Sequence, residues 1–158
     1  MQNKSNESGR TMLEMVGVLA IMGVIMYGAI AGIGFGVETY KINATYNMLE
    51  DLSQGIVDLY SWSPDYSGLN IPVLCQNDVV ECVSTQDQIQ TQWSGTNIAI
   101  GTTNDGHFLI EHNGLSPLAC ARLRDMTYSQ MKVDETTEGN FAGTNCQGNP
   151  PTLLFISR

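Results

Sequence analysis

The feature that most constrains this chain is an apolar run of 23 residues, 15–37 (MVGVLAIMGVIMYGAIAGIGFGV), which contains no charged side chain. As an α-helix rising about 1.5 Å per residue, the run would be ~34 Å long, and the hydrocarbon core of a bilayer is ~30 Å thick. No other part of the 158-residue chain is as long and as apolar. The sequence therefore predicts one membrane-spanning helix near the N-terminus.

The charges outside this run are mostly acidic. The chain has 7 Lys and Arg against 16 Asp and Glu, a net charge of −9, and residues 38–158 carry five basic and fourteen acidic side chains. This balance disfavours nucleic-acid binding, because sequence-independent affinity comes from Lys and Arg that neutralise phosphates. Lys4 and Arg10 precede the run and Glu38 follows it, so the positive-inside rule predicts a cytoplasmic N-terminus and an exported body.

All four cysteines lie in this body: Cys75, Cys82, Cys120 and Cys146. An even number in a small exported domain predicts two disulfides, which an oxidising compartment permits. Four cysteines allow three pairings. We prefer Cys75–Cys82 and Cys120–Cys146, because each of these pairs falls within one local segment of the chain.

The N-terminal 37 residues do not fit a cleaved secretory signal peptide. Such a peptide has an apolar stretch of about 7–15 residues before an A-x-A-like site, whereas this run is longer and ends in GIGFGVE. An uncleaved anchor fits better, except that Glu14 interrupts the start of the apolar segment and Gly9 stands five positions before it. A carboxylate in lipid costs ~2.5–3.5 kcal/mol at the bilayer centre and less near its edge, so it usually has a partner.

Together these residues form the segment GRTMLEMVGVLAIMGVI (9–25), which resembles the prepilin signature of type IV pilins and their pseudopilin relatives. In that family a membrane-bound peptidase cuts after the glycine, the new N-terminus is methylated, and a glutamate five residues on is the assembly residue. The resemblance implies a leader of residues 1–9, processing between Gly9 and Arg10, and an assembly role for Glu14. Arg10 departs from the apolar residue that the family usually has at this position.

The physics of a helix bundle agrees with an assembly role for Glu14. Cleavage would leave a mostly protonated α-amino group on Arg10, and the carboxylate of one subunit could meet the ammonium of its neighbour among parallel helices. The alternative is a carboxylate that only reaches the membrane surface. Gly28, Gly32 and Gly36 recur every four residues, a spacing that lets membrane helices approach closely, although such helices are generally rich in glycine.

Apolar residues continue at helical spacing beyond the membrane segment. Offsets of three and four place them on one face, and they are Val37, Tyr40, Ala44, Met48, Leu52, Ile56 and Leu59. This pattern predicts one helix from Met12 to about Ser61, ended by Pro64, with this face packed against a head. Residues 63–95 are expected to be a connecting loop with little regular structure.

The rest of the body predicts a small antiparallel sheet and one short helix. Strands are expected at 96–102, 107–112, 128–133 and 152–157, the first two joined by a turn at Asn104–Gly106. Ser116 and Pro117 predict a helix start, with the helix running to about Met126. The fold class is therefore α+β, a long N-terminal helix packed on a small antiparallel sheet, as in type IV pilins. The predicted parts are the leader 1–9, a membrane and assembly helix 10–37, and a head 38–158.

The sequence contains no recognisable catalytic or metal-binding constellation. Zinc prefers four ligands at short paired spacings, but six residues separate Cys75 from Cys82, and His107 and His112 are expected on opposite faces of a strand. Cysteine catalysis needs a free thiol, and neither a phosphate-binding loop nor a nucleophile elbow is present. We predict no enzyme activity, no cofactor and no metal.

The function predicted from the resemblance is that of a structural subunit of a type IV pilus. The stretch GLSPLACARL (114–123), with Cys120 and Cys146, resembles the disulfide-bounded C-terminal region of type IVb pilins. The resemblance implies a single-pass inner-membrane precursor and an extracellular filament that serves adhesion, conjugation or motility. It also implies partners: other copies of the chain, a prepilin peptidase, an assembly platform protein, an ATPase and a secretin. The alternatives are a minor pilin or secretion-system pseudopilin, and a membrane-anchored periplasmic binding domain.

Overall fold

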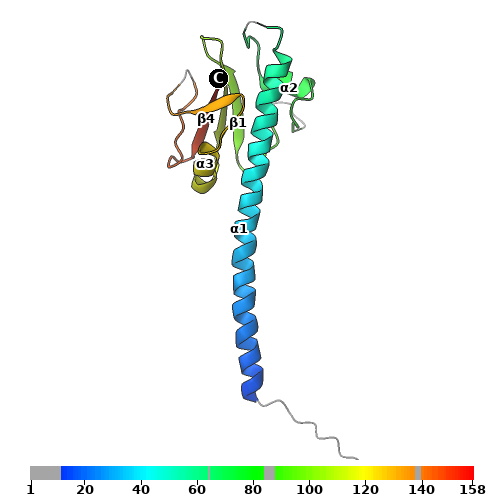
Figure 1. Cartoon of the computed structure of the whole chain (residues 1–158), viewed down its shortest axis with the longest axis vertical. Helices are drawn as coiled ribbons and strands as arrows, with labels where there is room; N and C mark the ends of the chain where they lie inside the picture. The colour runs from blue at the N-terminus through cyan, green and yellow to red at the C-terminus, as the bar shows by residue number, and fades with distance from the viewer. Residues whose placement is uncertain (1–11, 64, 84–87, 138–139) are drawn as a thin grey trace, which may run out of the picture. The chain divides into compact units, whose positions relative to one another are not determined.

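The computed structural model describes residues 12–63, 65–83, 88–137 and 140–158 (Figure 1). The chain forms two compact units that divide between Thr39 and Tyr40, and helix α1 (Met12–Leu59) contributes to both. The second unit also contains α2 (Ile71–Gln76), α3 (Pro117–Arg124) and four strands, β1 (Asn97–Thr102), β2 (Phe108–Asn113), β3 (Met131–Asp134) and β4 (Thr152–Ser157). A long, apolar N-terminal helix and a small antiparallel sheet give the predicted α+β layout.

The four strands form one antiparallel sheet in the order β1-β2-β4-β3. Strand β4 therefore lies between β2 and β3, and its Phe155 pairs with Ile110 on one side and with Val133 on the other. Three of the predicted strands agree with β1, β2 and β4 to within one residue. The fourth begins later than predicted, at Met131, because Tyr128 packs its ring against Tyr46 and Phe155 in the core instead of extending the sheet edge.

One face of the sheet carries the main hydrophobic core. Phe108, Ile110 and Phe155 are fully buried on this face together with Leu49 and Ile56 of α1. Alternate residues of a strand point to the same face, so Phe108 and Ile110 of β2 lie on one side of the sheet together with Phe155, which pairs with Ile110. Full burial of each such side chain contributes ~1.5–3 kcal/mol, which makes this contact the main stabilising one in the second unit.

The helix face that packs on the core agrees with the predicted one only in part. Tyr40 was predicted on the buried face but is 68% exposed, and Val37 is half exposed. The buried residues of α1 are Ile42, Thr45, Leu49, Leu52, Ser53 and Ile56. The prediction was right for Leu52 and Ile56, but it left out the buried apolar residues Ile42 and Leu49 and the hydroxyl residues Thr45 and Ser53. Thr45 donates its hydroxyl to the Lys41 carbonyl at 2.8 Å and Ser53 donates to the Glu50 carbonyl at 2.9 Å, so both can be buried without losing a hydrogen bond.

The prediction of a loop with little regular structure over residues 63–95 was also wrong in part. This segment contains α2, whose N-cap is Asn70: its side chain accepts a hydrogen bond from the Val73 N–H at 2.9 Å. Pro72 stands in the first turn, where a missing N–H costs nothing. Asn70 followed by Pro72 is a helix-start signal that the prediction missed. Pro64, the predicted end of the long helix, lies outside the described residues.

Residues 127–130, which precede β3, are held by a polar row on α1. The Tyr46 hydroxyl donates to the Thr127 carbonyl at 2.9 Å, and Glu50 Oε1 accepts a hydrogen bond from the Ser129 N–H at 2.8 Å.

We expect Glu50→Ala to lower the free energy of unfolding by about 1 kcal/mol, because it leaves the Ser129 N–H without its acceptor. Urea denaturation measures the loss. Asp51→Ala, at the neighbouring exposed position, is the control and should change the value by less than about 0.5 kcal/mol; an equal loss in both variants would contradict the assignment.

Candidate functional site: the apolar half of helix α1

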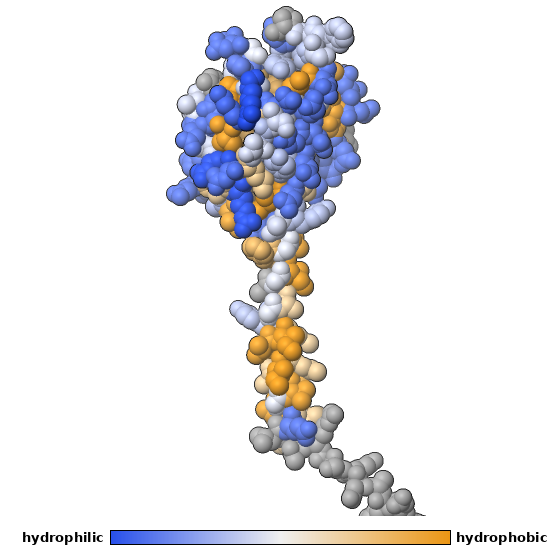
Figure 2. Space-filling view, in the orientation of Figure 1, coloured by the Kyte–Doolittle hydropathy of each residue, from blue (hydrophilic) through white to orange (hydrophobic). Residues whose placement is uncertain are grey.

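The first half of α1 exposes its apolar side chains in every direction. Among the described residues, fifteen of the nineteen exposed large hydrophobic side chains lie between Met12 and Val37, and Figure 2 shows them along the helix. Tyr27 is 80% exposed and Val24 is 74% exposed. By length and composition this helix can cross a membrane. Because a helix that is apolar on all sides is unfavourable in water, this segment needs lipid or neighbouring helices around it.

Glu14 lies in the first turn of α1, and its side chain is exposed. A carboxylate at this position interacts favourably with the partial positive charge of the helix N-terminus, by ~0.3–1 kcal/mol. In the part of the chain that the structure describes, the one ion pair joins Arg124 to Asp125, so the described residues supply no counter-charge for Glu14. Gly9 and Arg10, the predicted processing residues, lie outside the described residues.

Gly28, Gly32 and Gly36 lie in the same half of α1, four residues apart. A Cβ atom added to any of these three would meet no described atom within 4 Å. Residues four apart share one face of an α-helix, so these glycines leave a strip of backbone without side chains. Their predicted role in close helix packing therefore requires a neighbour outside this chain.

The four cysteines form Cys75–Cys82 and Cys120–Cys146, the two pairings that we preferred from the sequence. Cys120 is fully buried, and the second disulfide ties α3 to the segment before β4. The segment 141–146, which ends at Cys146, is also hydrogen-bonded to strands of the sheet. Here the Ala142 N–H donates to Glu111 Oε1 at 3.3 Å, and the Thr144 hydroxyl donates to the Leu154 carbonyl at 3.3 Å. This disulfide therefore links α3 to a segment that covers part of the sheet and is hydrogen-bonded to β2 and β4.

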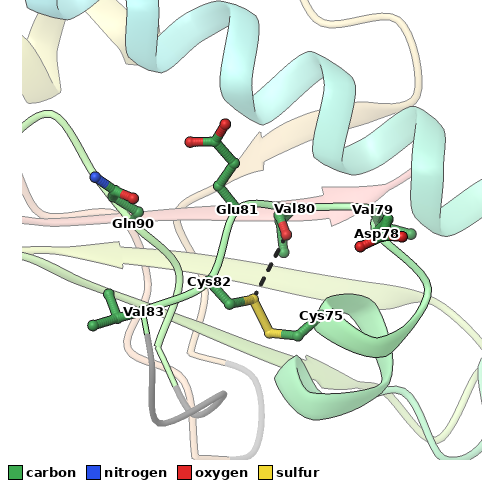
Figure 3. Close-up of a pocket in the computed structure, with 8 residues that line it drawn as sticks. All are labelled: Cys75, Asp78, Val79, Val80, Glu81, Cys82, Val83 and Gln90. Carbon is green, nitrogen blue, oxygen red and sulfur yellow. Dashed lines mark hydrogen bonds between the residues drawn. A yellow bond between two sulfur atoms is a disulfide. The ribbon is translucent and has the colours of Figure 1, made fainter.

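A hollow lies beside the other disulfide (Figure 3). Its lining residues are Cys75, Asp78, Val79, Val80, Glu81, Cys82, Val83 and Gln90. Cys82 Sγ lies 3.7 Å from the Val80 carbonyl oxygen, but a disulfide sulfur has no proton to donate, so this is a polar contact only. The hollow offers two carboxylates and no histidine. Within the described ranges, no group of three His, Cys, Asp or Glu side chains could hold a metal ion.

The two histidines lie in different environments. His107 precedes β2, and its Nδ1 lies 3.0 Å from Ser157 Oγ. His112 lies within β2, opposite Ile98 and Leu153, and is fully buried. Neither ring nitrogen of His112 has a hydrogen-bond partner among the described residues. Burial lowers the pKa of His112 to about 4, with a weaker opposing effect from the Asn113 backbone, so its ring is neutral at pH 7.

The burial of His112 was not predicted, although its alternation with Phe108 and Ile110 along β2 was a signal for it. Among the described residues, the feature with the strongest functional content is the apolar half of α1 with Glu14 at its start. Comparison of the chain with family models, with curated proteins and with solved structures gives no match.

Proposed function

We propose that this chain is a structural subunit of a type IV pilin-like filament, cleaved after Gly9 by a prepilin peptidase and assembled through α1. One observation carries the proposal. Glu14 stands five residues after Gly9 and at the start of a helix whose apolar side chains are exposed on all sides. The α+β layout and the disulfide-bounded C-terminal segment support the same proposal.

The proposed cycle explains how the exposed apolar surface is covered at each stage. Before assembly, lipid surrounds residues 15–37 and holds the precursor in the inner membrane with its N-terminus in the cytoplasm. After assembly, the corresponding helices of other subunits replace the lipid, and Glu14 meets the α-amino group of a neighbouring subunit. A platform protein, an ATPase and a secretin would then move the growing filament to the cell surface.

Processing is tested by intact mass spectrometry of the protein from its native membrane without reduction. We expect a mass that lacks residues 1–9, carries one added methyl group and is lower by the four hydrogens lost in two disulfides. A mass that retains the leader would contradict the proposal. It would favour instead a membrane-anchored binding domain that uses the apolar run as an uncleaved anchor.

Replacement of the glutamate tests assembly separately from folding. We expect Glu14→Ala to abolish filaments in sheared surface fractions, because the buried ammonium would lose its counter-charge. The head should keep its circular dichroism spectrum and both disulfides. Glu38→Gln, which changes the next acidic residue of α1, serves as the control and should still assemble. Filaments in normal amount from the Glu14 variant would refute the assembly role.

The glycine strip gives a second assembly prediction. We expect Gly32→Leu to reduce the filament yield several-fold, because a large side chain would keep neighbouring helices apart. Gly34→Leu is the matched control: this glycine is also uncrowded, but it lies off the strip by two helical positions. Quantitative immunoblots of sheared filaments compare the two. Equal yields would show that the strip has no special packing role.

A further inference from the structure

Lys41, Thr45 and Trp93 form a connected cluster in the second unit. The Lys41 Nζ lies 5.4 Å from the centroid of the Trp93 ring, within the range of a cation–π contact. The Trp93 indole N–H donates to Thr45 Oγ1 at 2.9 Å, and the Thr45 hydroxyl donates to the Lys41 carbonyl at 2.8 Å. These contacts join the indole to α1 although the two segments are far apart in the sequence.

The loop that carries Trp93 is itself well ordered by hydrogen bonds. The hydroxyl oxygens of Thr91 and Thr96 lie 2.9 Å and 3.1 Å from the Trp93 carbonyl oxygen and 2.7 Å from each other. Gly95 has a φ of 78°, which lets the loop turn back toward β1. The position of the indole is therefore fixed from both sides, by its own loop and by Thr45.

The cluster lies close to the end of the apolar run. Lys41 follows Val37 by four residues in α1, a rise of about 6 Å along the axis of a helix. The headgroup layer is roughly 5–8 Å thick on each side of a bilayer. Trp, Tyr and Lys are the residues typically found at this depth, and Tyr40, next to Lys41, is 68% exposed.

The charge pattern singles out the same residue. Lys41 is the only Lys or Arg between Arg10 and Arg122, in a chain with a net charge of −9. The charge of the Lys41 ammonium group is complementary to that of the phosphate in a lipid headgroup. The Trp93 ring covers one side of this ammonium, and a lysine has three N–H donors to direct elsewhere.

We propose that Lys41 and Trp93 form a docking site for the phosphate-bearing headgroup of a membrane phospholipid. Lys41 donates to the phosphate, and the Trp93 ring lies in the interface beside it. The contact forms while α1 is in the bilayer and is released when the subunit leaves it. This inference rests on the proposed membrane insertion of α1, but it does not depend on filament formation.

The chain has two tryptophans, and the second one is a built-in control. Trp62 lies beyond the end of α1, is 97% exposed, and is separated from Lys41 by about 27 Å of helix. The full chain is reconstituted into phosphatidylglycerol and phosphatidylethanolamine vesicles whose lipids are brominated near the top of the acyl chains. In the Trp62→Phe variant the tryptophan fluorescence comes from Trp93 alone, and in the Trp93→Phe variant it comes from Trp62 alone. We expect Trp93 to be quenched at least about twofold more than Trp62, because bromine quenches only indoles at the interface.

Vesicle flotation separates this inference from the proposed function. If the chain floats with the vesicles but Trp93 is quenched no more than Trp62, the docking site is refuted and membrane insertion stands. If the chain does not float, both are refuted. In the Trp62→Phe background, Lys41→Gln should reduce the quenching of Trp93, whereas Lys132→Gln, on β3, should not. Equal quenching in the two lysine variants would overturn the assignment of the phosphate contact to Lys41.

Discussion

Replacing both Cys120 and Cys146 with alanine is expected to lower the free energy of unfolding of the head by about 3.5 kcal/mol. This disulfide links residues 26 apart in sequence, and the loop-closure model assigns about 3.5 kcal/mol to a loop of that length. The same change frees the covering segment that includes Ala142 and Thr144 from its attachment to α3. Urea denaturation of the detergent-solubilised chain, followed by near-ultraviolet circular dichroism, measures the loss.

The other disulfide provides the matched comparison. Cys75 and Cys82 are only 7 residues apart, and the same model assigns about 2.5 kcal/mol to that loop. We therefore expect the Cys75→Ala and Cys82→Ala double variant to be the more stable of the two by about 1 kcal/mol. The reverse order would show that loop length does not determine how much each disulfide contributes to stability.

Lowering the pH is expected to destabilise the head through His112. Its pKa is about 4 in the folded chain and about 6.5 in the unfolded chain. Above pH 6.5 the ring is neutral in both states, so this group does not change the free energy of unfolding. Between pH 6.5 and 4 the unfolded chain binds a proton that the folded chain does not, so the free energy of unfolding falls as the pH decreases. The full loss is about 3 kcal/mol, since each pKa unit corresponds to ~1.4 kcal/mol.

Two variants isolate this effect from that of the acidic side chains. His112→Leu removes the titrating group and should flatten the dependence of stability on pH between 6.5 and 4. His107→Gln, which changes the other histidine, should leave the dependence as it is in the parent chain. Denaturation midpoints across this pH range measure both. If His112→Leu lost stability toward pH 4 as steeply as the parent, the destabilisation would have to come from other groups.

Local signals in the sequence were sufficient to predict most of the secondary structure. The turn at Asn104–Gly106, the Ser116 cap and the long helical period each act within a few residues, and the structure agrees with them. The buried face of α1 was not predictable from polarity alone, because the hydroxyl of Thr45 is satisfied by its own helix. Contacts such as that of Glu50 with Ser129, 79 residues apart, follow from the tertiary fold and have no local signal.

The functional residues also differ in whether the sequence could identify them. Glu14 and the glycines of α1 were found from spacing within a short segment, and their predicted roles concern neighbours outside the chain. The contact between Lys41 and Trp93 joins residues on opposite sides of a long intervening segment, and no local pattern in the sequence relates the two. Only the folded head brings them together, so a sequence pattern could not predict their proximity.

The position of β4 has a consequence for the order in which the sheet can form. Strands β2 and β3 do not pair with each other; each is hydrogen-bonded to β4. Until residues 152–157 have been synthesised and delivered, β3 has no partner in the sheet, and the segment before β4 has no strand to lie against. The sheet can therefore close only after its last strand is available, although β2 and β3 both precede that strand in the chain.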